Sequence, residues 1–196
     1  MVRFLSIFTV LLCIGFLHAQ EDDSTVVSEV KAAEIHWMTF EEALDANEQE
    51  PKKWLIDIYT DWCGWCKRMD ATTFKDSLIV DYVNGHYYAV SFDAEQKGDV
   101  VVGETTYKFV AEGRRGYHEL AAALMNGKMS YPTYVFLNGK LQNLSPIGGY
   151  KAAKDFLPIL EFIFEYDPET NPINWETFLT EYDSPYAEPE APAEEN

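Results

Sequence analysis

Cysteine, basic side chains and long apolar runs are all scarce in this sequence. Its 196 residues include three cysteines, too few for the dense disulfide framework that stabilises small exported domains. Lys and Arg number 15 against 33 Asp and Glu, which gives a formal net charge of −18. Because nucleic acids and anionic lipids are bound through clustered basic side chains, this balance argues against both as partners. Hydrophobic residues make up 47% of the chain, and the length predicts one compact domain plus tails.

The longest apolar run lies at the amino terminus. Residues 4–17 are almost entirely apolar and follow Arg3, but about 20 apolar residues are needed to span a bilayer as a helix. A positive start, a short apolar run and Ala19 before the first polar stretch predict a signal peptide over residues 1–19, cut after Ala19. An uncleaved membrane anchor is the alternative. We therefore expect an exported protein, periplasmic or secreted.

Cleavage at this point changes which cysteines the mature protein contains. It removes Arg3 and Cys13, so that 14 basic and 33 acidic residues leave a net charge of −19, and Cys63 and Cys66 are the cysteines that remain. In an oxidising compartment such a pair readily closes on itself. The ring between them is so small that loop entropy contributes little stability. Redox chemistry is therefore a better explanation for the pair than a structural role.

The rest of the chain alternates helix and strand patterns. Thr39 lies three residues before Glu42, a capping-box pattern that predicts a first helix from about Phe40 to Ala46. Residues 54–60 form a nearly continuous apolar run interrupted by Asp57, as in a central strand covered on both faces. The further predicted elements are helices at 63–73, 77–83 and 117–125, a strand at 87–92, a hairpin with strands at 134–137 and 140–144 around Asn138-Gly139, and a helix at 152–166 with Leu157, Leu160, Ile163 and Phe164 on one face.

Residues 94–116 are more than a minimal α/β unit needs. Within them, residues 100–102 and 105–110 flank Gly103-Glu104, which predicts an inserted β-hairpin. If the 87–92 strand runs parallel to the 54–60 strand, both carboxyl ends lie at the edge where open α/β folds bind ligands. The insertion would then flank the cysteines and could select substrates. Its Gly113-Arg114-Arg115-Gly116 stretch could contact an acidic partner, but we interpret it as a solvated loop.

Composition divides the remaining chain into a domain and its tails. Residues 20–34 form a polar, acidic and flexible lead-in to a domain over 35–166. Residues 167–182 carry Trp175 and Phe178 and are expected to dock on that domain. The Pro- and Glu-rich stretch 183–196 is expected to be a disordered acidic tail.

The candidate catalytic motif is Asp61-Trp62-Cys63-Gly64-Trp65-Cys66-Lys67, which lies between a predicted strand and a predicted helix. A helix start offers unpaired N–H groups and the positive end of the macrodipole, which stabilise a thiolate. The first cysteine of such a pair is usually the exposed one, so Cys63 is the predicted nucleophile. Cys66, one turn inward, is the predicted resolving thiol that attacks the mixed disulfide. A zinc site would need two more ligands, and the histidines are scattered singly, so we expect no metal.

This motif resembles the signature of the thioredoxin superfamily, Trp-Cys-Gly-x-Cys-Lys after a buried strand, and the likeness extends over about residues 40–163. Asp57 stands six residues before Cys63, at the spacing of the buried aspartate of thioredoxins. Tyr131-Pro132-Thr133 matches their cis-proline followed by threonine, and Asn138-Gly139 and Gly148 match their hairpin turn and their glycine before the last helix. Trp65 replaces the usual proline between the cysteines. In this respect the motif resembles those of exported thiol-disulfide interchange domains more than that of thioredoxin itself.

The resemblance implies a thioredoxin fold, with a central mixed β-sheet flanked by helices in the α/β class. It also implies that a cis Pro132 lies against the cysteine pair and that the backbone of Tyr131 pairs with an extended substrate segment. Asp57 would be a water-linked proton acceptor for Cys66, although it could instead only hydrogen-bond nearby backbone. Ala89 stands where thioredoxins carry a lysine beside this aspartate. The substrate-binding residues so implied are Trp62, Gly64, Trp65, Tyr131, Pro132, Thr133 and Gly148.

The direction of electron flow depends on how well the thiolate is stabilised. Asp57, Asp61 and Asp70 oppose it, whereas Lys67 and Arg68 favour it. This balance predicts a reductase or isomerase rather than a strong oxidase, acting on protein disulfides without a metal or organic cofactor. A reductase in an oxidising compartment must itself be reduced, which implies a membrane electron donor. The alternative is a thioredoxin-fold binding or chaperone-like module that holds clients through the apolar patch formed by Trp62, Trp65 and Tyr131.

Overall fold

The structure is a computed structural model that describes residues 33–187. The expected signal peptide, the lead-in before residue 33 and the tail beyond residue 187 lie outside the described residues. All of the described residues belong to one compact unit.

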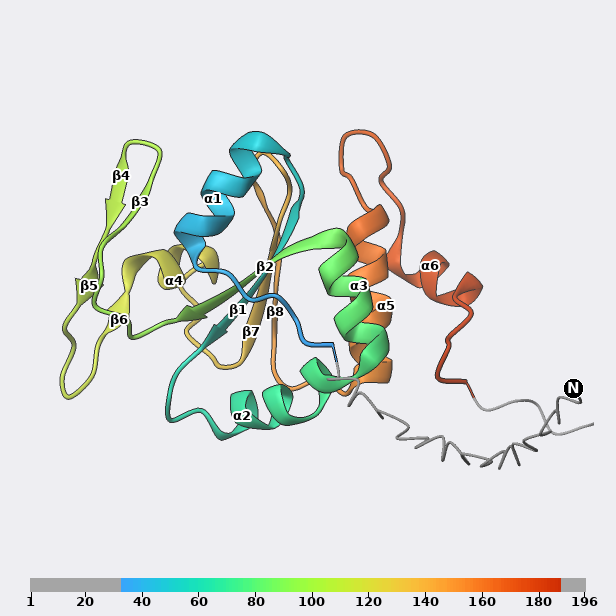
Figure 1. Cartoon of the computed structure of the whole chain (residues 1–196), viewed down its shortest axis with the longest axis horizontal. Helices are drawn as coiled ribbons and strands as arrows, with labels where there is room; N and C mark the ends of the chain where they lie inside the picture. The colour runs from blue at the N-terminus through green and yellow to red at the C-terminus, as the bar shows by residue number, and fades with distance from the viewer. Residues whose placement is uncertain (1–32, 188–196) are drawn as a thin grey trace, which may run out of the picture. The chain divides into compact units, whose positions relative to one another are not determined.

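A four-stranded mixed sheet forms the centre of this unit, with the strand order β2-β1-β7-β8 (Figure 1). β1 (Lys53–Tyr59) runs parallel to β2 (Tyr87–Asp93) and antiparallel to β7 (Thr133–Leu137), which pairs with β8 (Asn143–Gly148). The parallel pairing of the first two strands places their carboxyl ends at one edge of the sheet, as the sequence analysis required for an active edge.

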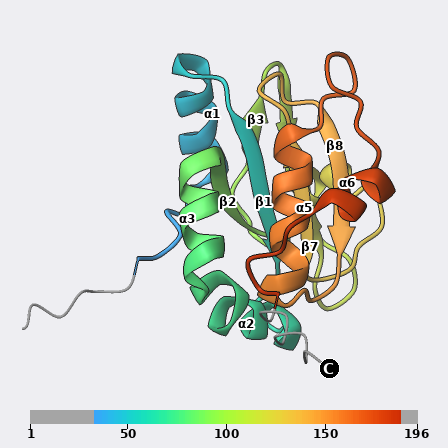
Figure 2. The ribbon, with the colours of Figure 1, turned by 90° about the vertical axis from the view of Figure 1, so that its right-hand side faces the viewer.

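Helices cover both faces of the sheet (Figures 1 and 2). One face carries α2 (Gly64–Ala71), the short η1 (Thr73–Lys75), α3 (Ser77–His86) and α5 (Ala153–Glu165), and the other carries α1 (Phe40–Gln49) and α4 (Glu119–Leu124). Side chains alternate along β1, so Leu55 packs into the first layer while Trp54 and Ile56 pack into the second. The same alternation places Asp57 on the face of Leu55, under α2 and α3.

Two of the helices agree with the sequence pattern except in detail. The capping box is present in α1, where Thr39 and Glu42 bond reciprocally, and the helix extends to Gln49. In α5, Leu157, Leu160 and Ile163 are buried as predicted. Placing Phe164 with them was wrong, because its side chain is 39% exposed and instead borders the rings of Tyr82, His86 and Tyr87.

The insertion forms two small hairpins. β3 (Val100–Val102) pairs with β4 (Thr105–Tyr107), which confirms the predicted hairpin, but the second strand does not continue to residue 110. Lys108 leaves the ladder because its N–H donates to Glu119 Oε2 at 2.8 Å and its carbonyl accepts from Glu119 N–H at 2.9 Å. The chain then forms β5 (Phe109–Val110), which pairs with β6 (Tyr117–His118). The helix predicted from residue 117 therefore begins at Glu119.

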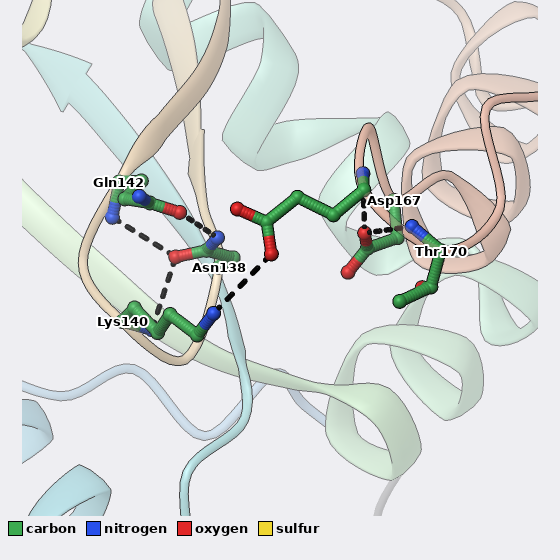
Figure 3. Close-up of polar contacts among 6 residues, drawn as sticks. Asn138, Lys140, Gln142, Asp167 and Thr170 are labelled. Carbon is green, nitrogen blue, oxygen red and sulfur yellow. Dashed lines mark hydrogen bonds and ion pairs between the residues drawn. The ribbon is translucent and has the colours of Figure 1, made fainter.

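The turn between β7 and β8 is longer than predicted, and a strand from residue 140 was wrong. Asn138 Oδ1 accepts hydrogen bonds from the N–H groups of Lys140 and Gln142, both at 3.0 Å (Figure 3). With Leu141 at φ 60°, these bonds close a compact loop, so β8 begins at Asn143. Lys140 also forms an ion pair with Glu169 at 3.5 Å, which links this loop to the loop after α5.

The carboxyl-terminal segment contacts the domain. α6 (Trp175–Glu181) packs on α5 through Phe162, whose ring centroid lies 5.0 Å from that of Trp175 and 5.4 Å from that of Phe178. Beyond it, the Tyr186 hydroxyl donates to Asp76 Oδ1 at 2.6 Å, at the N-cap of α3. The described part of the stretch expected to be disordered from residue 183 therefore contacts the domain as well.

Candidate active site

Cys63 and Cys66 are joined by a disulfide at the start of α2. Cys63 is the N-cap of this helix, and its Sγ accepts the Cys66 N–H at 3.0 Å, while its own N–H donates to the Thr60 carbonyl at 3.0 Å. Both cysteines are buried in this oxidised state, with 4% of Cys63 and 2% of Cys66 exposed. The sulfur of Cys63 thus already receives an N–H of the first helical turn, the arrangement that stabilises a thiolate.

The start of β7 brings the second half of the site to the same edge of the sheet. Thr133 pairs with Ile58 at the end of β1 and with Gly148 on β8. The peptide bond between Tyr131 and Pro132 is cis. The Tyr131 ring lies edge-on to the Trp62 ring, with centroids 5.8 Å apart, so this loop borders the cysteine motif.

Two exposed tryptophans flank the disulfide, and each has partners that the sequence analysis did not find. Trp62 is 50% exposed, and its Nε1–H donates to Glu95 Oε1 at 3.1 Å while the Arg115 guanidinium lies 4.1 Å from its ring centroid. The loop interpreted as merely solvated therefore reaches the site. Both partners belong to the insertion, which flanks the cysteines as the parallel strands predicted.

Trp65 is 60% exposed and lies on the other side, with its ring centroid 5.6 Å from that of Tyr150. The Arg68 guanidinium lies 5.6 Å from the Tyr150 ring, and the Tyr150 hydroxyl is 3.3 Å from the Thr72 hydroxyl. Tyr150 directly follows the glycines at the end of β8. Its position next to Gly148, already implicated by resemblance, is the sequence signal that could have drawn attention to it.

Asp57 is buried and has no hydrogen-bond partner among the described residues. It is 4% exposed and faces Ser91 on β2 and Tyr134 on β7 across the sheet. Within the part of the chain that the structure describes, neither Asp57 Oδ1 nor the Tyr134 hydroxyl has a partner, so Asp57 is not held by nearby backbone. Burial, and then the charge of Asp70, raise the pKa of Asp57 to about 8.

A cavity of about 330 Å³ connects this carboxyl with the surface. Its lining residues are Glu34, Ile35, Trp37, Asp57, Tyr59, Asp70, Phe74, Lys75 and Ser91. Burial also raises the pKa of Asp70, which Lys75 opposes. Lys75 forms a 2.9 Å ion pair with Glu34, and both side chains are more than half exposed. Lys75 is therefore the cation of this cavity, whereas Ala89 on β2 pairs with Leu55 and supplies none.

The mixed sheet, the disulfide at the start of α2 and the loop before β7 define a class of protein, the thioredoxin-like thiol-disulfide oxidoreductases. Within it, the family model Thioredox_DsbH, described as "Protein of unknown function, DUF255", matches residues 17–157. The chain belongs to this family. Over 143 residues it is 24% identical to the "Disulfide bond reductase DsbH" of Chlamydia pneumoniae, covering 72% of this chain and 80% of that protein.

Further similarities are shorter or concern the fold. A stretch of 42 residues, 21% of this chain, is 40% identical to the "Thiol:disulfide interchange protein DsbD" of Pseudoalteromonas atlantica and covers 7% of that protein. The solved structure titled "DsbH Oxidoreductase" has a TM-score of 0.50 at 18% identity, covering 71% of this chain and 90% of that one. A thioredoxin from Thermus thermophilus also has a TM-score of 0.50 at 18% identity, covering 66% and 87%. These structures share the thioredoxin fold with this chain.

Residues 33–187 contain neither a membrane-spanning helix nor a cluster of metal-ligating side chains. No helix in this range is long and apolar enough to cross a bilayer. No three His, Cys, Asp or Glu side chains in this range gather closely enough to hold a metal ion.

Proposed function

We propose that this protein is an exported reductase or isomerase of protein disulfides. The observation that carries the proposal is the Cys63–Cys66 disulfide at the start of α2, with Cys63 Sγ receiving an N–H of the helix and exposed aromatic rings on both sides. A buried disulfide with a purely structural role has no need of two exposed tryptophans beside it. The relative named a disulfide bond reductase supports the direction of electron flow.

In the proposed reaction the reduced protein transfers two electrons to its substrate. The Cys63 thiolate attacks one sulfur of the substrate disulfide, forming a mixed disulfide and releasing the other sulfur as a thiolate. Cys66 then loses its proton and attacks Cys63 Sγ. This step forms the Cys63–Cys66 disulfide and releases the second substrate thiolate. The released thiolates take up protons, so the substrate ends as a dithiol and the protein ends in its disulfide state.

Asp57 is the proposed acceptor of the Cys66 proton. A carboxyl with a pKa of about 8 holds or releases a proton near neutral pH, as a general base requires. From Asp57 the proton can reach solvent along the cavity that Asp70 and Lys75 also line. The acceptor thus has a path to the surface that does not pass through the docked substrate.

Substrate is proposed to bind as an extended segment along the loop before β7. The backbone of Tyr131 would pair with it, and Pro132, Thr133 and Gly148 would hold that loop in place. Trp62 and Trp65 would contact its side chains. Gly64, between the two tryptophans, has no heavy atom within 4 Å of a Cβ built on it, so the segment can approach the helix start closely.

The disulfide state must be reduced again by two electrons from another dithiol. Because an oxidising compartment does not keep such a dithiol reduced, the donor is proposed to be a membrane protein that brings electrons from outside this compartment. The predicted signal peptide and the two disulfide-handling relatives favour an exported, periplasmic location.

Trapping of substrates tests the proposal directly. In the Cys66→Ser variant the mixed disulfide cannot be resolved, so the pre-reduced protein should accumulate dithiothreitol-sensitive conjugates through Cys63 on non-reducing gels. Cys63→Ser is the matched control and should trap far less. A binding or chaperone-like module would hold clients without covalent conjugates in either variant, and this result would overturn the proposal.

The reduction potential of the Cys63–Cys66 pair decides the direction of electron flow between this protein and its substrates. We expect equilibration with glutathione buffers to give a value nearer to that of thioredoxin, about −270 mV, than to that of the strong oxidant DsbA, about −120 mV. A potential close to the second value would make the protein a disulfide donor.

A further inference from the structure

The arginines of the described chain gather beside the disulfide. Residues 33–187 contain Arg68, Arg114 and Arg115, and two of these stand over aromatic rings that border the disulfide. All four ion pairs between side chains in this range are formed by lysines. The guanidinium groups of Arg68 and Arg115 therefore have no carboxylate partner among the described residues, although acidic residues outnumber basic ones by more than two to one.

Both guanidinium groups are held by aromatic partners. The Trp62 Nε1–H donates to Glu95, the Trp62 ring lies edge-on to the Tyr131 ring, and the Arg115 guanidinium lies 4.1 Å from the Trp62 ring centroid. On the other side, Tyr150 contacts Trp65 and carries Arg68. Arg68 also donates toward the Tyr150 hydroxyl. Because a guanidinium has five N–H donors, both groups keep donors that fit a carboxylate with two parallel hydrogen bonds.

The two arginines come from opposite sides of the cysteine motif. Arg115 belongs to the loop between β5 and β6, which follows β2 at one end of the strand order, and it lies over the Trp62 ring. Arg68 belongs to α2 and lies over the ring of Tyr150, which follows β8 at the other end of the strand order and contacts Trp65. A segment lying across the disulfide would therefore pass one guanidinium on each side of its own cysteine.

We propose that the surface formed by Trp62, Trp65, Tyr131, Tyr150, Arg68 and Arg115 selects extended cysteine-containing segments that carry a carboxylate on each side of the cysteine. This inference rests on the proposed reaction with protein disulfides and names the class of segment that reacts. Charge complementarity carries it, because two guanidinium groups without a carboxylate partner among the described residues lie over aromatic rings beside the cysteine motif of a strongly acidic protein.

Salt distinguishes this local recognition from the field of the whole molecule. A net charge of −18 repels acidic segments at long range, and added salt weakens that repulsion. A local contact with arginine attracts them, and added salt weakens that attraction. Preference for acidic segments that falls as salt rises is therefore the signature of the two arginines, whereas the net charge alone predicts the opposite slope.

The test uses blocked heptapeptides with one central cysteine, each linked by a disulfide to 2-mercaptoethanol, which is uncharged. Glutamate stands two residues before the cysteine, two residues after it, at both places or at neither, with glutamine as the neutral replacement. The pre-reduced full chain reacts with each peptide, and the released peptide thiol is quantified by mass spectrometry after acid quench. Each rate is divided by that of the neutral peptide, so that changes in thiolate reactivity cancel.

The doubly acidic peptide should react faster than the neutral one, by about two- to fivefold for each exposed arginine contact. Arg115→Gln should remove the preference for glutamate on one side of the cysteine, and Arg68→Gln the preference on the other. Arg114→Gln is the matched control, since Arg114 neighbours Arg115 but lies over no aromatic ring of the described residues, and its ratios should equal those of the unaltered protein.

Equal rates for acidic and neutral peptides, or a preference that survives in both arginine variants, would overturn the inference and leave the proposed function intact. Failure of every peptide disulfide to react would overturn both. A faster reaction of the doubly acidic peptide that grows with salt would assign the effect to the net charge and reject the role of the arginines.

Discussion

At the scale of single residues, Asp57 has the most unusual environment in the described chain. It lies on the inner face of a central strand, opposite Tyr134, whose hydroxyl is also buried and has no partner within residues 33–187. Burial and the Asp70 carboxylate act in the same direction and favour the protonated form of Asp57. A thioredoxin-like lysine beside the aspartate would act against them, but Ala89 occupies that position, and Lys75 affects Asp70 instead.

This environment predicts how the resolving step depends on pH. Asp57 must be ionised to accept the Cys66 proton, so the rate of mixed-disulfide resolution should rise with pH up to about 8. Asp57→Asn should slow this step by about a hundredfold at neutral pH and remove that part of the profile. Single-turnover kinetics with a neutral disulfide would measure both effects, and an unchanged profile would contradict the role of Asp57.

Asp70 is an acidic neighbour of Asp57, and its effect on the pKa of Asp57 can be measured separately. Asp70→Asn should lower the pKa of Asp57, because it removes the like charge that helps to raise it. The profile of the resolving step should then shift to lower pH while the maximal rate is retained. A shift to higher pH would show that Asp70 acts on Asp57 in some other way.

At the scale of elements, the insertion is built into the domain rather than attached to its surface. Val100 of β3 is buried in the core between the sheet and α1. The buried His118 accepts the Leu120 N–H at the start of α4 and reaches the Gly98 carbonyl through Nε2 at 2.9 Å. Removing residues 94–116 altogether would therefore uncover core as well as change partner choice, and a smaller change is needed to test selection of substrates.

Gly116 offers such a change. It has a φ of 143°, and an added Cβ would collide with the Phe109 ring and the Val110 carbonyl, so Gly116→Ala should displace the β5–β6 loop and move Arg115 off Trp62. Reduction of a protein disulfide rich in acidic residues should slow by about two- to fivefold, with no change for a small neutral disulfide. Gly98→Ala is the control, because nothing lies within 4 Å of its added Cβ. Equal loss with both substrates would argue against substrate selection by this loop.

At the scale of the whole molecule, the Asp57 carboxyl links stability to pH. Its pKa is raised from 3.8 to about 8 by folding, so the folded state binds a proton that the unfolded state has released between these values. The contribution to the free energy of unfolding is complete below pH 3.8 and is lost as pH rises through about 8, by about 1.4 kcal/mol for each pH unit between them.

Chemical denaturation of the oxidised protein between pH 4 and 8 measures this linkage. The unaltered protein should lose stability over this range more steeply than Asp57→Asn, by about 1.4 kcal/mol per pH unit. The difference between the two proteins isolates Asp57, since the other acidic groups are common to both. Parallel curves would mean that Asp57 is ionised in the folded protein throughout.

The redox activity of the cysteine motif could be predicted from the local sequence. A buried apolar strand followed by Trp62 to Lys67 predicts a strand, a turn and a helix start, and short-range backbone geometry alone then places Cys63 at an N-cap. The inserted hairpin was also predicted, because turn residues between β-branched runs are a short-range signal. The spacing of Asp57 and of Tyr131-Pro132 carried a family resemblance, and the family match supports it.

Other features were determined only by the tertiary structure, because they depend on contacts between distant parts of the chain. Lys108 bonds to Glu119 instead of continuing its strand, and the Phe164 ring packs against α3. Asn138 closes its loop through side-chain hydrogen bonds. The hydrophobic periodicity of the sequence predicts none of these contacts. Arg115 meets Trp62 across 53 positions of sequence, and Tyr150 meets Trp65 across 85. The sequence by itself determined which atoms can react, because reactivity follows from local chemistry. Folding determined what surrounds them, because burial and the pairing of charges arise when distant segments come together.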